Sequence, residues 1–197
     1  ERDVIDKILA AAATAPMGYP PHTTEVVVID QREELDSLLE QLVEEYDSMV
    51  KAFSNPIGRA IVRLNAGAEH FGMLKHHVID TARFANELYR SDSVDRYMYG
   101  APVLMMFHGS RWGMSYEENA HLVCHHAMLA AVALGLGTTI IGMIPPVVDR
   151  SKELRERYGI PKDHRVLTSL ILGYPRYKYR KGIRRELAGL QFNAVVH

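Results

Sequence analysis

Apolar residues recur along this chain in two patterns, helix-like stripes and short β-branched runs. The clearest stripe covers residues 31–53, where apolar side chains recur three and four positions apart. A second long helix is expected over residues 115–134, because acidic residues open it and Gly135 follows its end. Further helices are expected over residues 3–13, 57–90 and 151–158. Apolar runs predict buried strands over residues 25–30, 103–107, 138–141 and 166–172.

The order of these elements predicts a sheet covered by helices. Strands alternate with helices, and the helices occupy more of the chain, which indicates an α/β or α+β sandwich. We expect residues 1–175 to form this core. Residues 176–197 differ, because basic residues crowd their start, no amphipathic period is visible and apolar residues end them. They are predicted to form an arm that packs on another surface, such as a partner subunit.

Composition narrows the function classes. The 197 residues carry a net charge of -1, so no overall charge attracts nucleic acid or a membrane surface. The single cysteine, Cys124, excludes an intrachain disulfide and an iron–sulfur cluster held by this chain alone, and it favours the cytoplasm. No signal-peptide pattern opens the sequence. Residues 127–148 lack charges, but glycines and prolines interrupt them, so we predict a buried helix and strand instead of a membrane span.

Four motifs follow one another along the chain. They are Ala-Pro-Met-Gly-Tyr-Pro-Pro at 15–21, Tyr-Gly-Ala-Pro at 99–102, Leu-Ala-Ala-Val-Ala-Leu-Gly-Leu-Gly-Thr-Thr-Ile-Ile-Gly at 129–142 and Leu-Gly-Tyr-Pro at 172–175. In their order and spacing they resemble the nitroreductase family, particularly the branch whose members often carry an N-terminal iron–sulfur ferredoxin module. The resemblance covers nearly the whole chain.

The resemblance implies a fold and an activity. Family members form a three-layer α+β sandwich with a central mixed sheet flanked by helices. A C-terminal arm crosses to the partner of an intertwined homodimer, and FMN binds between the subunits. Members transfer hydride from NAD(P)H to nitroaromatics, quinones or related small-molecule acceptors by a ping-pong mechanism. By resemblance we therefore expect an FMN-dependent oxidoreductase whose catalysis is centred on the flavin, with a ferredoxin-type protein as an alternative donor.

The first motif is matched to a cofactor-binding loop. In the family this loop reaches the flavin ring of the partner subunit, and Gly18 would allow a close approach of the backbone. The usual loop carries serine and asparagine, so apolar packing is expected here instead of side-chain hydrogen bonds. The matched residues are Pro16, Met17, Gly18, Tyr19 and Pro20.

Two further segments are matched to cofactor contacts. Ile141, Gly142 and Met143 correspond to the segment whose backbone approaches flavin N5, where a glycine leaves room for the ring. Lys178 and Arg180 correspond to a Lys-x-Arg pair near the FMN phosphate. The basic Arg-x-Ser-x-Arg segment that usually grips the phosphate is missing from this sequence, and we expect it to belong before the first residue or to be replaced by the Lys-x-Arg pair.

A histidine cluster offers a different interpretation. His121 and His125 are one helical turn apart and His126 follows, which is a spacing that two metal ligands can use. No second ligand group has motif spacing, so we interpret the cluster as interface histidines and expect no metal site. A metal-binding interaction domain stays open as an alternative, as does a flavin-binding protein without turnover. No G-x-G-x-x-G, Walker A or G-x-S-x-G motif supports a Rossmann dinucleotide site or a serine hydrolase.

Overall fold

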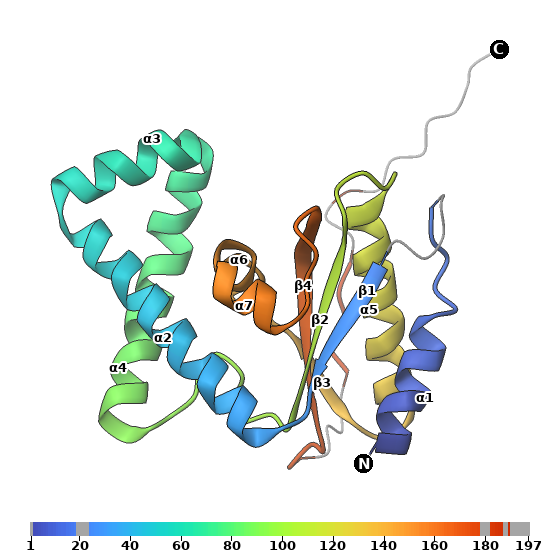
Figure 1. The fold of residues 1–197 in the computed structure, drawn as a ribbon. Helices are drawn as coiled ribbons and strands as arrows, with labels where there is room; N and C mark the ends of the chain where they lie inside the picture. The colour runs from blue at the N-terminus through green and yellow to red at the C-terminus, as the bar shows by residue number, and fades with distance from the viewer. Residues whose placement is uncertain (1, 19–23, 178–181, 187–188, 190–197) are drawn as a thin grey trace.

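A four-stranded sheet with helices on both faces forms the centre of the molecule (Figure 1). A computed structural model describes residues 2–18, 24–177, 182–186 and 189. The strands lie in the order β1-β2-β4-β3 and are β1 (Thr24–Ile29), β2 (Val103–Ser110), β3 (Gly137–Ile140) and β4 (His164–Gly173). The helices are α1 (Arg2–Ala12), α2 (Arg32–Ser54), α3 (Pro56–Met73), the π-helix η1 (Leu74–Val78), α4 (Ile79–Asp92), α5 (Tyr116–Ala133), α6 (Ile144–Arg150) and α7 (Lys152–Arg157).

The strand pairings correct one expectation about the sheet. All three pairings in the described part of the chain are antiparallel, so the expected mixed sheet is wrong. β2 and β3 do run in the same direction, because each is antiparallel to β4, but β4 lies between them. An alternation of strands and helices along the sequence does not specify which strands become neighbours. The α+β class is confirmed, with antiparallel neighbours throughout.

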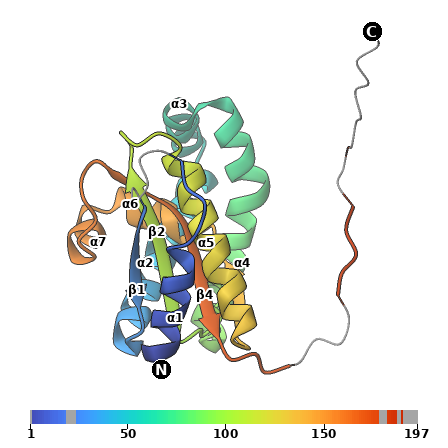
Figure 2. The same cartoon turned by 90° about the vertical axis from the view of Figure 1, so that its right-hand side faces the viewer.

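Alternating side chains of β2 supply the two hydrophobic cores. Leu104 and Met106 join the core that α2, α4 and α6 cover, whereas Met105 and Phe107 join the core under α1 and α5. All four side chains are fully buried, as expected for a strand with helices on both faces. Figure 2 shows α1 and α5 in front of the sheet, with α2, α3 and α4 behind it and α7 at its left.

The edge strands are less buried than the sequence predicted. Thr139 and Ile140 of β3 are exposed, which contradicts a buried strand there. β-Branched residues favour a pleated backbone whether or not it is covered, so their presence does not separate an edge strand from a central one. β3 also pairs only with the second half of β4, from Leu170 onward. Among the described residues, the first half of β4 therefore has no strand on that side, and its edge there is open.

A helical excursion, defined as residues 32–92, connects β1 to β2 and projects away from the sheet (Figure 1). The predicted stripe of α2 is confirmed, since its leucines and Tyr46 are buried in the core. α3 is different, because none of its residues is buried. Gly67 has a φ of 77° and interrupts the helical backbone inside α3. α3 therefore depends little on the sheet for its packing.

Two helices differ from what the sequence predicted, α6 in its presence and α5 in its burial. α6 was not expected, because Pro145 and Pro146 were interpreted as breakers, yet proline is tolerated in the first turn of a helix. α5 was expected and is confirmed, but Leu129 and Val132 are 52% and 57% exposed. The single chain therefore does not bury this apolar helix on every side.

Within the described residues, every helix is too short or too polar to cross a membrane.

Asp47 links α2 to α4 and makes the stability of the excursion depend on pH. Arg90, at 3.1 Å, and Lys51, at 2.7 Å, lower the pKa of its carboxyl from 3.8 to about 2. A depressed carboxyl pKa stabilises the fold above pH 4, and this contribution is lost as the pH falls toward 2. We expect Asp47→Asn to lower the free energy of unfolding by about 1 kcal/mol at pH 7, a value limited by the solvent exposure of both partners. Urea unfolding at pH 7 and pH 3 measures it.

The control for this prediction is Asp80→Asn, which breaks an exposed ion pair with Arg83 on the same excursion. We expect the control to change the free energy of unfolding by under about 0.5 kcal/mol. A difference between wild type and Asp47→Asn that stays the same at both pH values would contradict the assignment.

Candidate functional site

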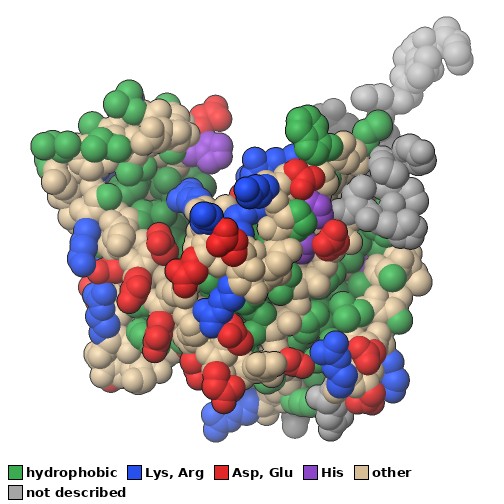
Figure 3. Space-filling view, viewed as in Figure 1, with side chains coloured by type: hydrophobic (Ala, Val, Ile, Leu, Met, Phe, Trp, Pro, Cys, Tyr) green, Lys and Arg blue, Asp and Glu red, His purple; other side chains and the backbone are tan. Residues whose placement is uncertain are grey.

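A cavity of about 600 Å³ opens where the sheet meets the helical excursion. Its walls come from α2, α3, η1, α5 and α6, together with Arg165, Val166 and Leu167 of β4. These β4 residues are the ones that β3 leaves uncovered. Figure 3 shows the hollow between the excursion and the sheet, with basic side chains gathered on its sheet side. Its volume lies in the range of small-molecule and cofactor sites.

The segment after β3 forms part of the cavity wall. Ile141 is held against β4, since its N–H donates to the Ser169 carbonyl at 2.9 Å and its carbonyl accepts from the Ser169 hydroxyl at 2.6 Å. Gly142 and Met143 then turn into the wall. A Cβ placed on Gly142 would meet no atom within 4 Å. The backbone at Gly142 is therefore open to a group lying in the cavity.

Tyr46 of α2 fixes the far end of this segment. Its hydroxyl donates to the Met143 carbonyl at 2.7 Å. Burial raises the pKa of Tyr46 to about 12, so the phenol keeps its proton at neutral pH and remains a donor. The residues on the two sides of Gly142 are thus tied to β4 and to α2. The open backbone is presented by a rigid segment.

Two arginines bring positive charge to the cavity. Arg165 is paired with Glu117 of α5 at 3.0 Å. Arg150, at the end of α6, makes no ion pair with any residue that the structure describes. It is exposed, and its positive charge is close enough to Tyr46 to oppose the rise in the pKa of that phenol caused by burial. Among the described residues of the wall, Arg150 is therefore an arginine that can meet an anionic group.

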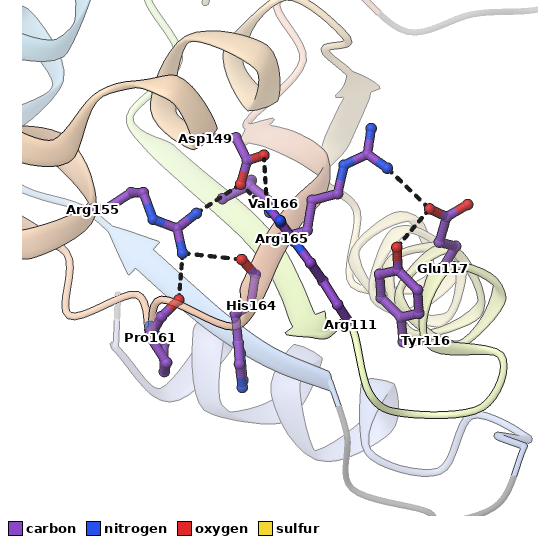
Figure 4. Close-up of polar contacts among 9 residues, drawn as sticks. All are labelled: Arg111, Tyr116, Glu117, Asp149, Arg155, Pro161, His164, Arg165 and Val166. Atoms are coloured by element: carbon purple, nitrogen blue, oxygen red, sulfur yellow. Dashed lines mark hydrogen bonds and ion pairs between the residues drawn. The ribbon is translucent and has the colours of Figure 1, made fainter.

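Asp149 organises the polar side of the wall (Figure 4). One carboxylate oxygen accepts from Arg155 at 2.7 Å and from the backbone N–H of Val166 at 3.2 Å. Arg155 also donates to the carbonyls of Pro161 and His164. The guanidinium thus joins α6, α7 and the start of β4 into one unit. This unit holds the strand edge that lines the cavity.

The structure places the first motif elsewhere. The N–H of Gly18 donates to the Asn119 side chain of α5 at 2.7 Å. A Cβ on Gly18 would lie 3.1 Å from the Ser115 Cβ, so a side chain there would press on the start of α5. None of Pro16, Met17 and Gly18 lines the cavity within one chain. The remaining matched residues, Tyr19, Pro20, Lys178 and Arg180, lie outside the described residues.

Several wall residues were not singled out from the sequence. Tyr46, Arg150 and Arg165 belong to three separate elements, and no short motif connects them. Of the histidine cluster, His121 lines the cavity, whereas the rings of His125 and His126 meet edge to face at 6.2 Å. The helix that carries them was predicted, but the position of its face relative to β4 depends on the tertiary fold.

Solved structures of known proteins share this fold. A nitroreductase of Bacteroides fragilis solved with bound FMN superposes with a TM-score of 0.70, at 17% identity over 98% of this chain and 88% of the other. A nitroreductase with bound FMN from Desulfitobacterium hafniense gives 0.63, at 18% identity over 94% and 84%. A BluB-like flavoprotein of Clostridium difficile gives 0.64, at 14% identity over 94% and 86%.

Sequence comparison provides the family. No curated protein sequence matches the chain. The family model described as "Nitroreductase family" matches residues 1–174, which is most of the sequence. The chain therefore belongs to the nitroreductase family.

Proposed function

We propose that this protein is an FMN-dependent oxidoreductase that transfers hydride from NAD(P)H to a nitroaromatic, quinone or related acceptor. The observation that carries the proposal is the open backbone at Gly142, which faces a cavity of about 600 Å³ in a chain of the nitroreductase family. Structural neighbours with this fold have been solved with FMN. Bound FMN would supply the two-electron hydride chemistry between donor and acceptor.

The wall residues fit a flavin in shape and charge. A planar ring needs a close approach to the backbone, which Gly142 permits because no Cβ intervenes. An anionic phosphate or a reduced ring needs nearby positive charge, and Arg150 and Arg165 carry it. Tyr46 holds the Met143 carbonyl and so keeps the segment beside the ring in place. The role of these residues is to bind and orient, while electron transfer belongs to the cofactor.

We further propose a homodimer in the cytoplasm, with residues 176–197 as an arm reaching the partner. Leu129, Val132 and Leu134 at the end of α5 are between 43% and 57% exposed, which leaves an apolar face for a second subunit. The loop Pro16–Gly18 lies outside the chain's own cavity, and a dimer gives it a second cavity to reach. A ferredoxin-type donor in place of NAD(P)H is an outcome that the experiment below distinguishes.

The test is flavin uptake followed by turnover. We expect the purified protein to bind about one FMN per chain, with a yellow spectrum and quenched flavin fluorescence. With excess FMN, we expect NADH or NADPH to be oxidised with a quinone or nitrofuran acceptor at about 1 s⁻¹ or faster, as is typical of enzymes.

A colourless protein that takes up no added FMN would contradict the proposal. Stoichiometric FMN binding without oxidation of either nicotinamide would support FMN as the cofactor and contradict the proposed use of NAD(P)H as the donor. Reduction of the bound flavin by a ferredoxin in that case would identify the other donor.

A further inference from the structure

Three potential metal ligands meet on neighbouring strands outside the cavity. Glu25 of β1 is the direct cross-strand partner of His108 in β2. Val166 of β4 is the cross-strand partner of His108. His164 lies two positions before Val166 on the same strand, opposite Ser110 of β2. Directly opposed and diagonal residues on one face of an antiparallel sheet are within side-chain reach of each other. The three side chains therefore form one cluster, which we call the β-face triad.

A β-bulge is the reason that the two histidines share a face. The β2–β4 pairing passes from Phe107–Thr168 to His108–Val166, so β4 carries one extra residue at this point. A regular ladder would oppose His108 with Leu167 and would place His164 on the other face of the sheet. Bulges commonly redirect a side chain in this way next to functional sites. The extra residue therefore creates the triad.

The distances within the triad suit a bound ion. Nδ1 of His108 and Nδ1 of His164 are hydrogen-bonded at 2.9 Å, and the other ring nitrogen of His164, Nε2, lies 4.0 Å from a Glu25 oxygen. One ligand atom from each residue lies within 4.8 Å of the other two. Ligands of a tetrahedral zinc ion, at about 2.0–2.1 Å from the metal, are separated by roughly 3.3 Å. Rotation of the exposed Glu25 side chain is the movement that would bring the three ligand atoms toward this separation.

Burial divides the triad into a fixed part and an adjustable part. His108 and His164 are 2% and 8% exposed, whereas Glu25 is exposed. The backbone of His164 is held by Arg155, which donates to its carbonyl, and Figure 4 shows the imidazole pointing away from this guanidinium. The charge of Arg155 is met by Asp149 at 2.7 Å. Two buried imidazoles are thus preset, and the exposed carboxylate is free to rotate toward an ion.

We propose that Glu25, His108 and His164 bind a divalent cation of borderline softness, with Zn²⁺ as the best match. Imidazole nitrogen and carboxylate oxygen are ordinary ligands of this ion, and three protein ligands leave a fourth position for water. The ion joins β1, β2 and β4, so it acts as a clamp across the sheet. The site differs from the histidine cluster of α5, and it is independent of flavin binding.

Titration of the full, tag-free chain with Zn²⁺ tests the proposal, and Co²⁺ absorbance reports the geometry. We expect one Zn²⁺ per chain and a melting temperature raised by about 5 °C in saturating metal. Glu25→Gln is expected to weaken binding at least tenfold, and His164→Gln to abolish it. Glu33→Gln, an exposed carboxylate of α2, and the double variant His121→Gln/His125→Gln are the controls and are expected to bind as the wild type does.

Circular dichroism checks that each variant is folded. Glu25 is exposed, so its variant keeps the test decisive if His164→Gln does not fold. Wild-type affinity in a folded Glu25→Gln or His164→Gln variant would overturn the proposal. So would loss of binding in the His121/His125 double variant, or the absence of Zn²⁺ binding to the wild type at millimolar metal.

Discussion

Replacing Gly142 with leucine is expected to weaken FMN binding by roughly 100-fold or more, about 2.7 kcal/mol, and to remove turnover at ordinary flavin concentrations. The new side chain enters the cavity, because a Cβ on Gly142 meets no atom of the chain within 4 Å. The fold should be unaffected, since Gly142 is not among the glycines with positive φ. Fluorescence titration with FMN measures the loss, and the melting temperature of the apoprotein checks the fold.

Gly72 of α3 offers the matched control for this experiment. A Cβ there also meets no atom within 4 Å, and the residue is outside the cavity wall. Gly72→Leu is expected to bind FMN as the wild type does. Equal FMN affinity of the Gly142→Leu variant and the wild type would remove this segment from the flavin site, whatever the control does.

Replacing Arg155 with methionine is expected to lower the free energy of unfolding by about 3 kcal/mol. Methionine retains the apolar stem but removes every bond of the guanidinium, which joins Asp149 to the carbonyls of Pro161 and His164. Arg155 and Asp149 are only 13% and 18% exposed, so the carboxylate left behind is poorly hydrated. Urea unfolding of the apoprotein at pH 7 measures the change.

Arg157→Met provides the comparison on the same helix. Arg157 pairs with Glu34 at 2.7 Å, but both side chains are about one-third exposed. Its loss is expected to cost under about 1 kcal/mol. If both variants lost the same stability, the network around Asp149 would have no special role in holding the start of β4.

The sequence predicted local structure well and neighbour relations poorly. The stripe of α2 and the central strand β2 were both confirmed, because side-chain periodicity follows directly from backbone geometry. The antiparallel order was not foreseen, since β4 inserts between β2 and β3 through contacts distant in sequence. The exposure of β3 was missed for a similar reason. Threonine and isoleucine favour a strand at the edge as well as at the centre.

The candidate site was predicted in part. Gly142 and Met143 were matched to a cofactor segment because they follow a strand, and both line the cavity, while their contact with a flavin stays a prediction. Tyr46 was not found, because it lies 97 positions from the carbonyl that it contacts. The β-face triad was also hidden: His108 and His164 are 56 positions apart, and their common face depends on one extra residue in β4. Only the folded register brings these groups together.

Because α3 packs little against the sheet, its residues can be substituted with little effect on the stability of the fold. α3 contributes no buried residue to either core, yet Ala66, His70 and Met73 line the cavity. Substitutions at these positions therefore change the cavity wall without disturbing the sheet or the segment at Gly142. If the cavity holds the proposed flavin, a library randomised at these three positions should retain folded, flavin-binding members at high frequency and differ in the acceptors that they reduce.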